Sequence, residues 1–170
     1  GVLRWSTDDG TYKQWLAPQD GLPDNDVRDL VRDRAGALWA GTAAGLARLD
    51  EGSDRWLTVE ADAGLLPSRS VTALAAAADG SIWVGLEQTW DENAPHPALD
   101  EPGAFVGGGL ARFDPASGGW GPVVRALAGE DAGVRVAGLP SDNVTDVAFG
   151  ADGLLWVATR PYYAWREDAC

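Results

Sequence analysis

Short runs of alternating apolar and polar residues, bounded by Gly, Asp or Pro, follow one another along most of the chain. In the region 21–63 these runs are Val27–Arg32 (VRDLVR), residues 37–42 (ALWAGT), Gly45–Asp50 (GLARLD) and a short run around Trp56. Runs of this length with this alternation are typical of half-buried β-strands. Ala35-Gly36 lies between the first two runs, where Gly permits the tight turn of a hairpin. The pattern therefore predicts four short antiparallel strands in this region.

The first half of this unit occurs three times with one spacing. Segments that begin at Pro23, Pro67 and Pro140 each reach a Trp sixteen residues later. These Trp residues are Trp39, Trp83 and Trp156. Gly-Leu precedes each Pro, with one extra Leu in the second segment, and the turn recurs at Asp79-Gly80 and Asp152-Gly153. A fixed spacing found three times indicates an internal repeat.

The second half of the unit also recurs. GLARLD at Gly45 is matched by GLARFD at Gly109 and more loosely by GVLRWS at Gly1. Each then reaches a Trp, and these are Trp56, Trp120 and Trp15. One complete unit spans residues 21–63, and four strands per unit with Gly and aromatic markers predict the blades of a β-propeller. We interpret the six repeated Trp residues as packing between blades, and Trp5 as structural because it stands where Leu49 and Phe113 stand.

These motifs resemble the two-component regulator propeller repeats, whose pattern is LPxNxV, then DxxGxLWxGT, then GLxRYD. The first unit carries the matching residues Leu22-Pro23, Asn25, Val27, Asp33, Gly36, Leu38-Trp39, Gly41-Thr42, Gly45-Leu46, Arg48 and Asp50. The other units depart from this pattern. Ala77 and Gly150 stand at the position of Asp33 in the second and third units, and Ala158 stands at the position of Gly41 in the third. The resemblance implies an extracytoplasmic (periplasmic or extracellular) sensor region of a bacterial signalling protein. Because these repeats encode the propeller scaffold, the resemblance is stronger evidence for the fold than for a particular function.

The predicted fold is all-β, a single propeller segment of about three four-stranded antiparallel blades. Residues 1–20 would form an outer half blade, 21–63 a full blade, 64–137 a blade with insertions at 87–105 and 125–137, and 138–170 an inner half blade and tail. Closed propellers have about four to eight blades. Two explanations stay open. Because Gly1 is not preceded by Met, the chain is expected to be a segment of a longer propeller; alternatively, two copies close a six-bladed ring as a homo-oligomer.

Composition limits the partners. The 170 residues are 45% apolar and 23% charged, as in folded globular domains, and the net charge is −13. Nucleic-acid binding needs a basic surface, so this class of partner is excluded. No apolar run is long enough to cross a bilayer, so membrane insertion by this segment is not expected. Cys170 is the only Cys, which excludes an internal disulfide and leaves its own role open.

The candidate functional site is the first insertion, residues 87–105, expected as an ordered loop between two strands. Loops on a rigid scaffold often carry function. Its candidate residues for binding a small ligand or a protein partner are Trp90, Asp91, Glu92, His96, Asp100 and Glu101. These carboxylates and the lone His could suit a hard cation such as Ca²⁺, but their spacing matches no known loop, so neither a metal nor a cofactor is predicted.

Three function classes remain after this reading. We expect a non-catalytic recognition module that senses a ligand or partner through its insertions. The alternative is an assembly subunit that forms a ring. A propeller lyase or glycosidase is the third class, but His96 has no identifiable acid or base partner, so no catalytic residue is nominated. Residues 161–170 are interpreted as a degraded third strand or as a docking segment.

Overall fold

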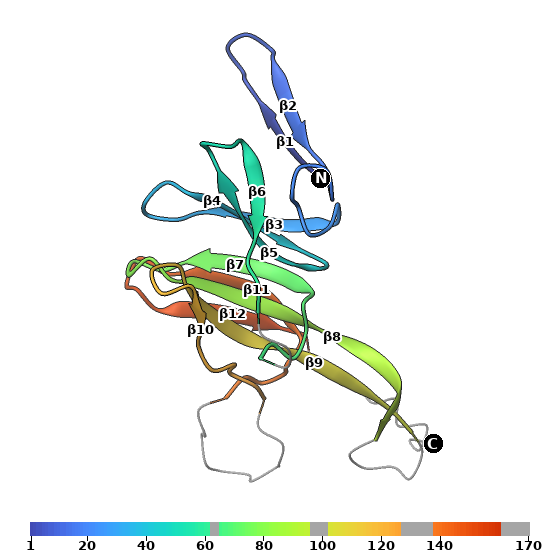
Figure 1. Cartoon of the computed structure of the whole chain (residues 1–170). Coiled ribbons are helices and arrows are strands. Elements are labelled where there is room, and N and C mark those ends of the chain that lie inside the picture. Colours follow the sequence, from blue (N-terminus) through green and yellow to red (C-terminus); the bar gives the residue numbers. More distant parts are fainter. Residues whose placement is uncertain (62–64, 96–101, 127–137, 161–170) are drawn as a thin grey trace.

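The computed structural model describes residues 1–61, 65–95, 102–126 and 138–160 (Figure 1). These residues form twelve strands: β1 (Val2–Trp5), β2 (Tyr12–Trp15), β3 (Val27–Arg32), β4 (Leu38–Thr42), β5 (Gly45–Asp50), β6 (Arg55–Thr58), β7 (Val71–Ala76), β8 (Ile82–Pro95), β9 (Pro102–Asp114), β10 (Gly119–Trp120), β11 (Val144–Phe149) and β12 (Leu155–Thr159). No helix occurs within these ranges, and so none that could cross a membrane.

The strands form four antiparallel sheets. Two of them are four-stranded, β3-β4-β5-β6 and β7-β8-β9-β10, and two are two-stranded, β1-β2 and β11-β12. Neighbours in sequence are neighbours in the sheet, as expected for hairpins joined by short turns. The all-β prediction with four-stranded antiparallel blades is confirmed. The two-stranded sheets do not pair with each other in this chain.

The first hairpin of each unit turns where the sequence predicts it. Gly36, Gly80 and Gly153 have φ of 90°, 89° and 79°, a region that L-residues rarely adopt. Beside the first turn, the Asp33 carboxylate accepts the Ala37 backbone N–H at 2.9 Å and the Trp39 indole N–H at 2.9 Å. In the first unit Asp33 therefore closes the turn and fixes the orientation of Trp39.

The hydrophobic core lies between the sheets rather than inside any one of them. One cluster joins β1-β2 to β3–β6 through Val2, Trp15, Ala47, Leu49 and Trp56. The largest cluster joins β3–β6 to β7–β10, and a third joins β7–β10 to β11-β12. The sheets are therefore stacked in chain order, which leaves β1-β2 at one end and β11-β12 at the other. Figure 1 shows β1-β2 standing apart at its end.

Trp15 does not occupy the repeat position of Trp56 and Trp120, so this part of the sequence interpretation is wrong. Leu49 pairs with Trp56 and Phe113 with Trp120, whereas Trp5 pairs with Tyr12. Tyr12 is therefore the equivalent residue. Trp15 lies three residues further along β2 and points to the opposite face. There it is buried against Trp56, with ring centroids 6.5 Å apart, and its indole N–H donates to Asp54 O at 3.0 Å.

Trp39, Trp83 and Trp156 do share one position, but they are not equally buried. Trp39 is buried, Trp83 is partly buried and Trp156 is 66% exposed. The reason is the sheet that follows each of them in the stack. Trp39 faces the complete sheet β7–β10, Trp83 faces only two strands, and no described strand covers Trp156. The expectation of core packing is therefore wrong for Trp156, and equally for the exposed Trp5 at the other end.

Candidate functional site

The first insertion is not a loop but a continuation of two strands. β8 and β9 run on past the blade, and Gln88 pairs with Gly107, Thr89 with Val106, Trp90 with Phe105 and Asp91 with Ala104. Figure 1 shows this two-stranded arm projecting beyond the other sheets. We call residues 88–95 and 102–107 the β8–β9 arm. The sequence expectation failed here because Pro and acidic residues weaken the strand pattern without preventing pairing on an isolated hairpin.

Trp90 is held in place although 54% of it is exposed. Its ring lies 5.1 Å from that of Phe105, edge to face. On the same side, a Cβ added to Gly103 would come within 2.5 Å of the Trp90 ring, so the indole lies directly on the Gly103 backbone. Only Gly permits this approach, and φ of 121° at Gly103 also favours Gly. The arm therefore presents a large aromatic face in a defined orientation.

The predicted acidic residues are only partly placed together. Asp91 and Glu92 follow Trp90 on β8, and the Asp91 carboxylate accepts the Asn93 backbone N–H at 2.9 Å. His96, Asp100 and Glu101 lie outside the described residues. Within the described ranges, no three His, Cys, Asp or Glu side chains gather as a metal ion would need. The described part of the site is therefore Trp90 and Phe105 with two carboxylates beside them.

The base of the β8–β9 arm is fastened to the next segment of the chain. Gly109 N–H donates to Asp142 O at 2.6 Å. The Arg125 guanidinium donates to Gly107 O at 3.0 Å and forms an ion pair with Asp142 at 3.1 Å. These contacts join the arm to the start of the third unit. Arg125 was expected only as the beginning of the second insertion, whose residues 127–137 lie outside the described ranges.

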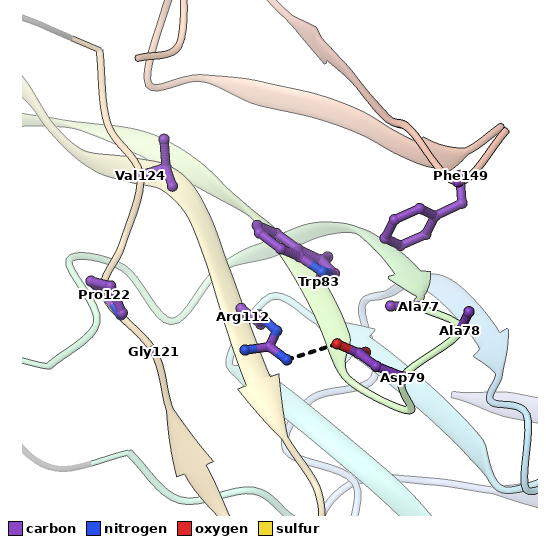
Figure 2. Close-up of a pocket in the computed structure, with 10 residues that line it drawn as sticks. Ala77, Ala78, Asp79, Trp83, Arg112, Gly121, Pro122, Val124 and Phe149 are labelled. Atoms are coloured by element: carbon purple, nitrogen blue, oxygen red, sulfur yellow. Dashed lines mark hydrogen bonds and ion pairs between the residues drawn. The ribbon is translucent and has the colours of Figure 1, made fainter. Parts of the chain in front are cut away.

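A groove of about 630 Å³ lies beside Trp83, between β7–β10 and β11-β12 (Figure 2). Its walls include Trp83, Phe149 and Val124, and at one side Arg112 donates to Asp79 at 2.9 Å. At the equivalent place one interface earlier, Phe113 covers Trp39 with centroids 5.7 Å apart, and Trp120 packs on Phe113 at 5.0 Å. The groove is therefore an inter-blade contact at which no aromatic residue of the described ranges takes the place of Phe113 and Trp120.

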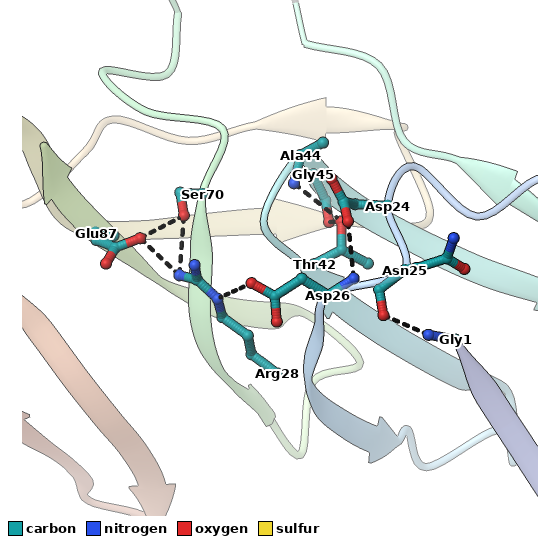
Figure 3. A network of polar contacts seen from close by, with 10 residues as sticks. All are labelled: Gly1, Asp24, Asn25, Asp26, Arg28, Thr42, Ala44, Gly45, Ser70 and Glu87. Atoms are coloured by element: carbon teal, nitrogen blue, oxygen red, sulfur yellow. Dashed lines mark hydrogen bonds and ion pairs between the residues drawn. The ribbon is translucent and has the colours of Figure 1, made fainter. Parts of the chain in front are cut away.

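An ion-pair network joins the two four-stranded sheets at their edge (Figure 3). Arg28 on β3 donates to Glu87 on β8 at 2.6 Å, to Ser70 at 2.9 Å and to Asp26 at 3.2 Å. The Ser70 hydroxyl also donates to Glu87 at 2.7 Å. The hydroxyl and the guanidinium together lower the pKa of the Glu87 carboxyl. Glu87, counted in sequence as the start of the insertion, is thus a blade contact.

This network predicts an acid-sensitive contribution to stability. Because the pKa of Glu87 is lower in the folded chain, its contribution is complete above the ordinary value of 4.5 and is lost as pH falls through the folded value. The side chain is 37% exposed, so the contribution is screened to less than about 1 kcal/mol. We expect Glu87→Gln to be less stable than the wild type at pH 6, with a difference that shrinks as the pH is lowered to 3, measured by urea denaturation.

The control for this experiment is Glu92→Gln, which removes one carboxylate from the β8–β9 arm, away from the blade contact. We expect its stability difference from the wild type to stay small at both pH values. A Glu87→Gln difference that does not shrink on acidification would contradict the assigned role of the ion pair.

Sequence reasoning missed three features of this region: the Trp83 groove, the pairing of Phe105 with Trp90, and the Arg28–Glu87 pair. The pairing of Phe105 with Trp90 had a signal, because extending the register of β8 and β9 from Trp83–Arg112 places Trp90 opposite Phe105. The Arg28–Glu87 pair had none, because it joins two different sheets. The sequence carried no signal for the Trp83 groove, since the groove depends on which strands are present in the third blade.

Comparisons with known proteins agree with this architecture. Residues 21–44 and 138–160 match the family model described as two component regulator propeller. These segments contain β3-β4 and β11-β12, the first hairpins of the first and third units. No curated protein is significantly similar to the chain in sequence.

Two solved structures from B. thetaiotaomicron have the same fold. One, described as the extracellular domain of hybrid two component system BT3049, has 17% identity and a TM-score of 0.60 over 91% of this chain and 16% of its own. The other, described likewise for BT4673, has 13% identity and a TM-score of 0.58 over 94% of this chain and 23% of its own. The chain thus spans less than a quarter of either structure. Two of its hairpins, β3-β4 and β11-β12, thus match the repeat of the two component regulator propeller family.

Proposed function

We propose that this chain is a non-catalytic recognition module of an extracytoplasmic sensor, and that the β8–β9 arm makes the contact. The observation that carries this proposal is Trp90, which is 54% exposed and yet fixed by Phe105 and Gly103. Trp is among the residues that dominate binding energy at protein interfaces. A side chain already held in its orientation loses less conformational entropy on binding.

The surroundings of Trp90 indicate the kind of partner. Asp91 and Glu92 follow it on β8, and the chain as a whole carries a net charge of −13. A protein surface with an apolar pocket bordered by Lys or Arg is complementary to this arrangement. The extracytoplasmic location is supported by the solved structures with this fold, which are described as extracellular domains. We therefore place a protein partner, rather than a small ligand, at the arm.

The arm can be removed without touching the blade. Because Gln88 pairs with Gly107, replacing residues 89–106 by Asn-Gly joins these strands through a two-residue hairpin turn. We expect this variant to keep the far-UV circular dichroism and urea midpoint of the parent and to lose partner binding. Trp90→Ala in the intact arm should weaken binding by about tenfold or more.

The partner is identified by a photo-crosslinking residue placed at position 92, followed by binding measurements with the purified captured protein. The matched control is Leu57→Ala, because Leu57 is 53% exposed but lies on β6, away from the arm. Binding that survives both Trp90→Ala and removal of the arm would overturn the proposal. Unfolding of the arm-less variant would show instead that the arm is part of the scaffold.

A further inference from the structure

The β8–β9 arm leaves the blade through three consecutive glycines, which we call the glycine joint. Gly107, Gly108 and Gly109 have φ of 80°, 75° and 109°, whereas an extended strand has negative φ. Pairing between β8 and β9 is found at Leu86–Gly109 and again at Gln88–Gly107, but not at the position between them. The regular ladder of these two strands is therefore interrupted where the arm begins.

Backbone N–H groups at the glycine joint donate to other segments of the chain. Glu87 N–H donates to Ser70 O at 2.9 Å, and Gly109 N–H donates to Asp142 O at 2.6 Å. A Cβ at Gly108 would clash with the same Asp142 oxygen, so the start of the third unit lies directly against the joint. The joint is thus held between the second blade on one side and the third unit on the other.

The Arg125 side chain spans the joint. Its guanidinium donates to Gly107 O at 3.0 Å and to the Asp142 carboxylate at 3.1 and 3.2 Å. The Asp142 side chain is 12% exposed and also accepts the Ala126 backbone N–H. Arg125 is therefore bonded at once to the arm and to a carboxylate that is fixed in the third unit.

The repeat separates this ion pair from the common scaffold. Asn25 stands at the position of Asp142, and its side-chain oxygen accepts the Ala17 backbone N–H at 2.8 Å, as the Asp142 carboxylate accepts that of Ala126. The residue before Ala17 is apolar, whereas the residue before Ala126 is Arg125. The contact to the backbone therefore belongs to the repeat, and the ion pair is an addition at the place where the arm leaves the blade.

We propose that Arg125 is a positioning residue that fixes the direction of the β8–β9 arm, and with it the direction of Trp90. When the ion pair is broken, the arm turns about the glycine joint while the blades stay folded. This inference rests on the recognition proposed for the arm, because it names the residue that holds Trp90 ready for the partner. An arm held in one direction loses less conformational entropy on binding than a released one.

The blade does not depend on the Arg125 side chain. Val124 and Leu110 exchange backbone hydrogen bonds at 2.8 and 2.9 Å, and Arg125 O accepts the Leu139 N–H at 3.2 Å. These backbone contacts remain when the side chain is shortened. Because the side chain is also 46% exposed, we expect Arg125→Ala to keep the far-UV circular dichroism of the parent.

Distances between spin labels in the whole chain measure the direction of the arm. In a Cys170→Ser background, Glu92→Cys carries one label on the arm and Ala116→Cys carries the other in the exposed turn after β9. We expect a narrow distance distribution in the parent and one about twofold wider or more in Arg125→Ala. The pair Leu57→Cys and Ala116→Cys, with both labels on blades, should stay narrow in both chains.

Arg112→Ala is the matched control. Arg112 lies on β9 within the blade, forms an ion pair with Asp79 at 2.9 Å and is 44% exposed, close to the 46% of Arg125. Its removal should leave the arm distances unchanged. Asp142→Asn is a second test, because it keeps an acceptor for the Ala126 N–H and removes the charge that holds Arg125. We expect it to widen the arm distances as Arg125→Ala does.

This inference and the recognition proposal fail on different results. Arm distances that stay narrow in Arg125→Ala and Asp142→Asn, or that widen equally in Arg112→Ala, overturn the role of Arg125. An Arg125→Ala chain that unfolds overturns it as well, since the side chain then belongs to the scaffold.

Partner binding is the second measurement. Arg125→Ala should weaken binding by about threefold to tenfold, through the arm that it releases. A released arm with unchanged binding overturns the positioning role. Binding that survives Trp90→Ala while Arg125→Ala still releases the arm contradicts the recognition proposal and supports Arg125 as the residue that fixes the arm.

Discussion

Replacing Trp39 by Ala is expected to lower the free energy of unfolding by about 3–5 kcal/mol, the usual cost of removing a buried large aromatic side chain. Trp39 is 1% exposed and lies at the centre of the contact between the two four-stranded sheets. Its ring contacts Phe113 at 5.7 Å, and its indole N–H donates to Asp33. The substitution leaves a cavity between blades and removes the hydrogen bond to Asp33. Urea denaturation followed by circular dichroism measures the loss.

Two variants separate packing from the hydrogen bond. Trp39→Phe keeps an aromatic ring against Phe113 but cannot donate to Asp33, so we expect it to recover more than half of the lost stability. Leu57→Ala controls for a truncation at an exposed site, and its effect should stay within about 0.5 kcal/mol. A Trp39→Ala loss as small as that of Leu57→Ala would mean that the sheets are not held together at this contact.

The second large effect is expected at Gly41, on β4. A Cβ at this position would lie 2.5 Å from Val71 Cγ1 and 3.3 Å from Leu74 Cγ, both on the neighbouring sheet. Gly41→Ala should therefore destabilise the chain by about 1–3 kcal/mol, because it pushes β3–β6 and β7–β10 apart. The same close approach occurs at Gly85, whose Cβ would lie 2.7 Å from Val144 Cγ1.

A double-mutant cycle identifies the cause. Val71→Ala removes the atom that the new methyl would meet, so Gly41→Ala should cost much less in a Val71→Ala chain than in the wild type. The matched control is Gly36→Ala combined with Val71→Ala, since a Cβ at Gly36 would meet no atom within 4 Å and any cost there comes from φ of 90°. Additive effects for Gly41 and Val71 would contradict close packing between the blades.

The repeat could be read from sequence because each marker residue acts locally. Trp39, Trp83 and Trp156 each pair with the residue at the same position of the preceding strand, and the three turn glycines all have positive φ. Trp15 was placed wrongly because matching Trp to Trp is weaker evidence than strand register. Trp5 and Tyr12 are separated by seven residues, as are Leu49 and Trp56, and this spacing identifies Tyr12 as the equivalent residue.

Burial could not be read from the repeat, because it depends on the sheet that comes next. Trp39 and Trp156 stand at the same position of the repeat and of its first hairpin, yet one is buried and the other exposed. The β8–β9 arm was likewise not recognisable as strands, since its pairing continues only because β8 and β9 are already aligned in the blade. The candidate residues Trp90, Asp91 and Glu92 lie on this arm, but the sequence did not predict how they are arranged there.

Sequence was therefore sufficient for the all-β class, the four-stranded unit and its turns, since these follow from alternation, glycine φ preferences and repeat spacing over short distances. The tertiary structure was needed to see that Trp90 is held on Gly103, that Glu87 joins two blades, and that the stack leaves a groove at Trp83. Each of these depends on contacts between sheets or across an extended hairpin. Such contacts depend on which strands lie beside one another, and a local pattern of residues does not specify this.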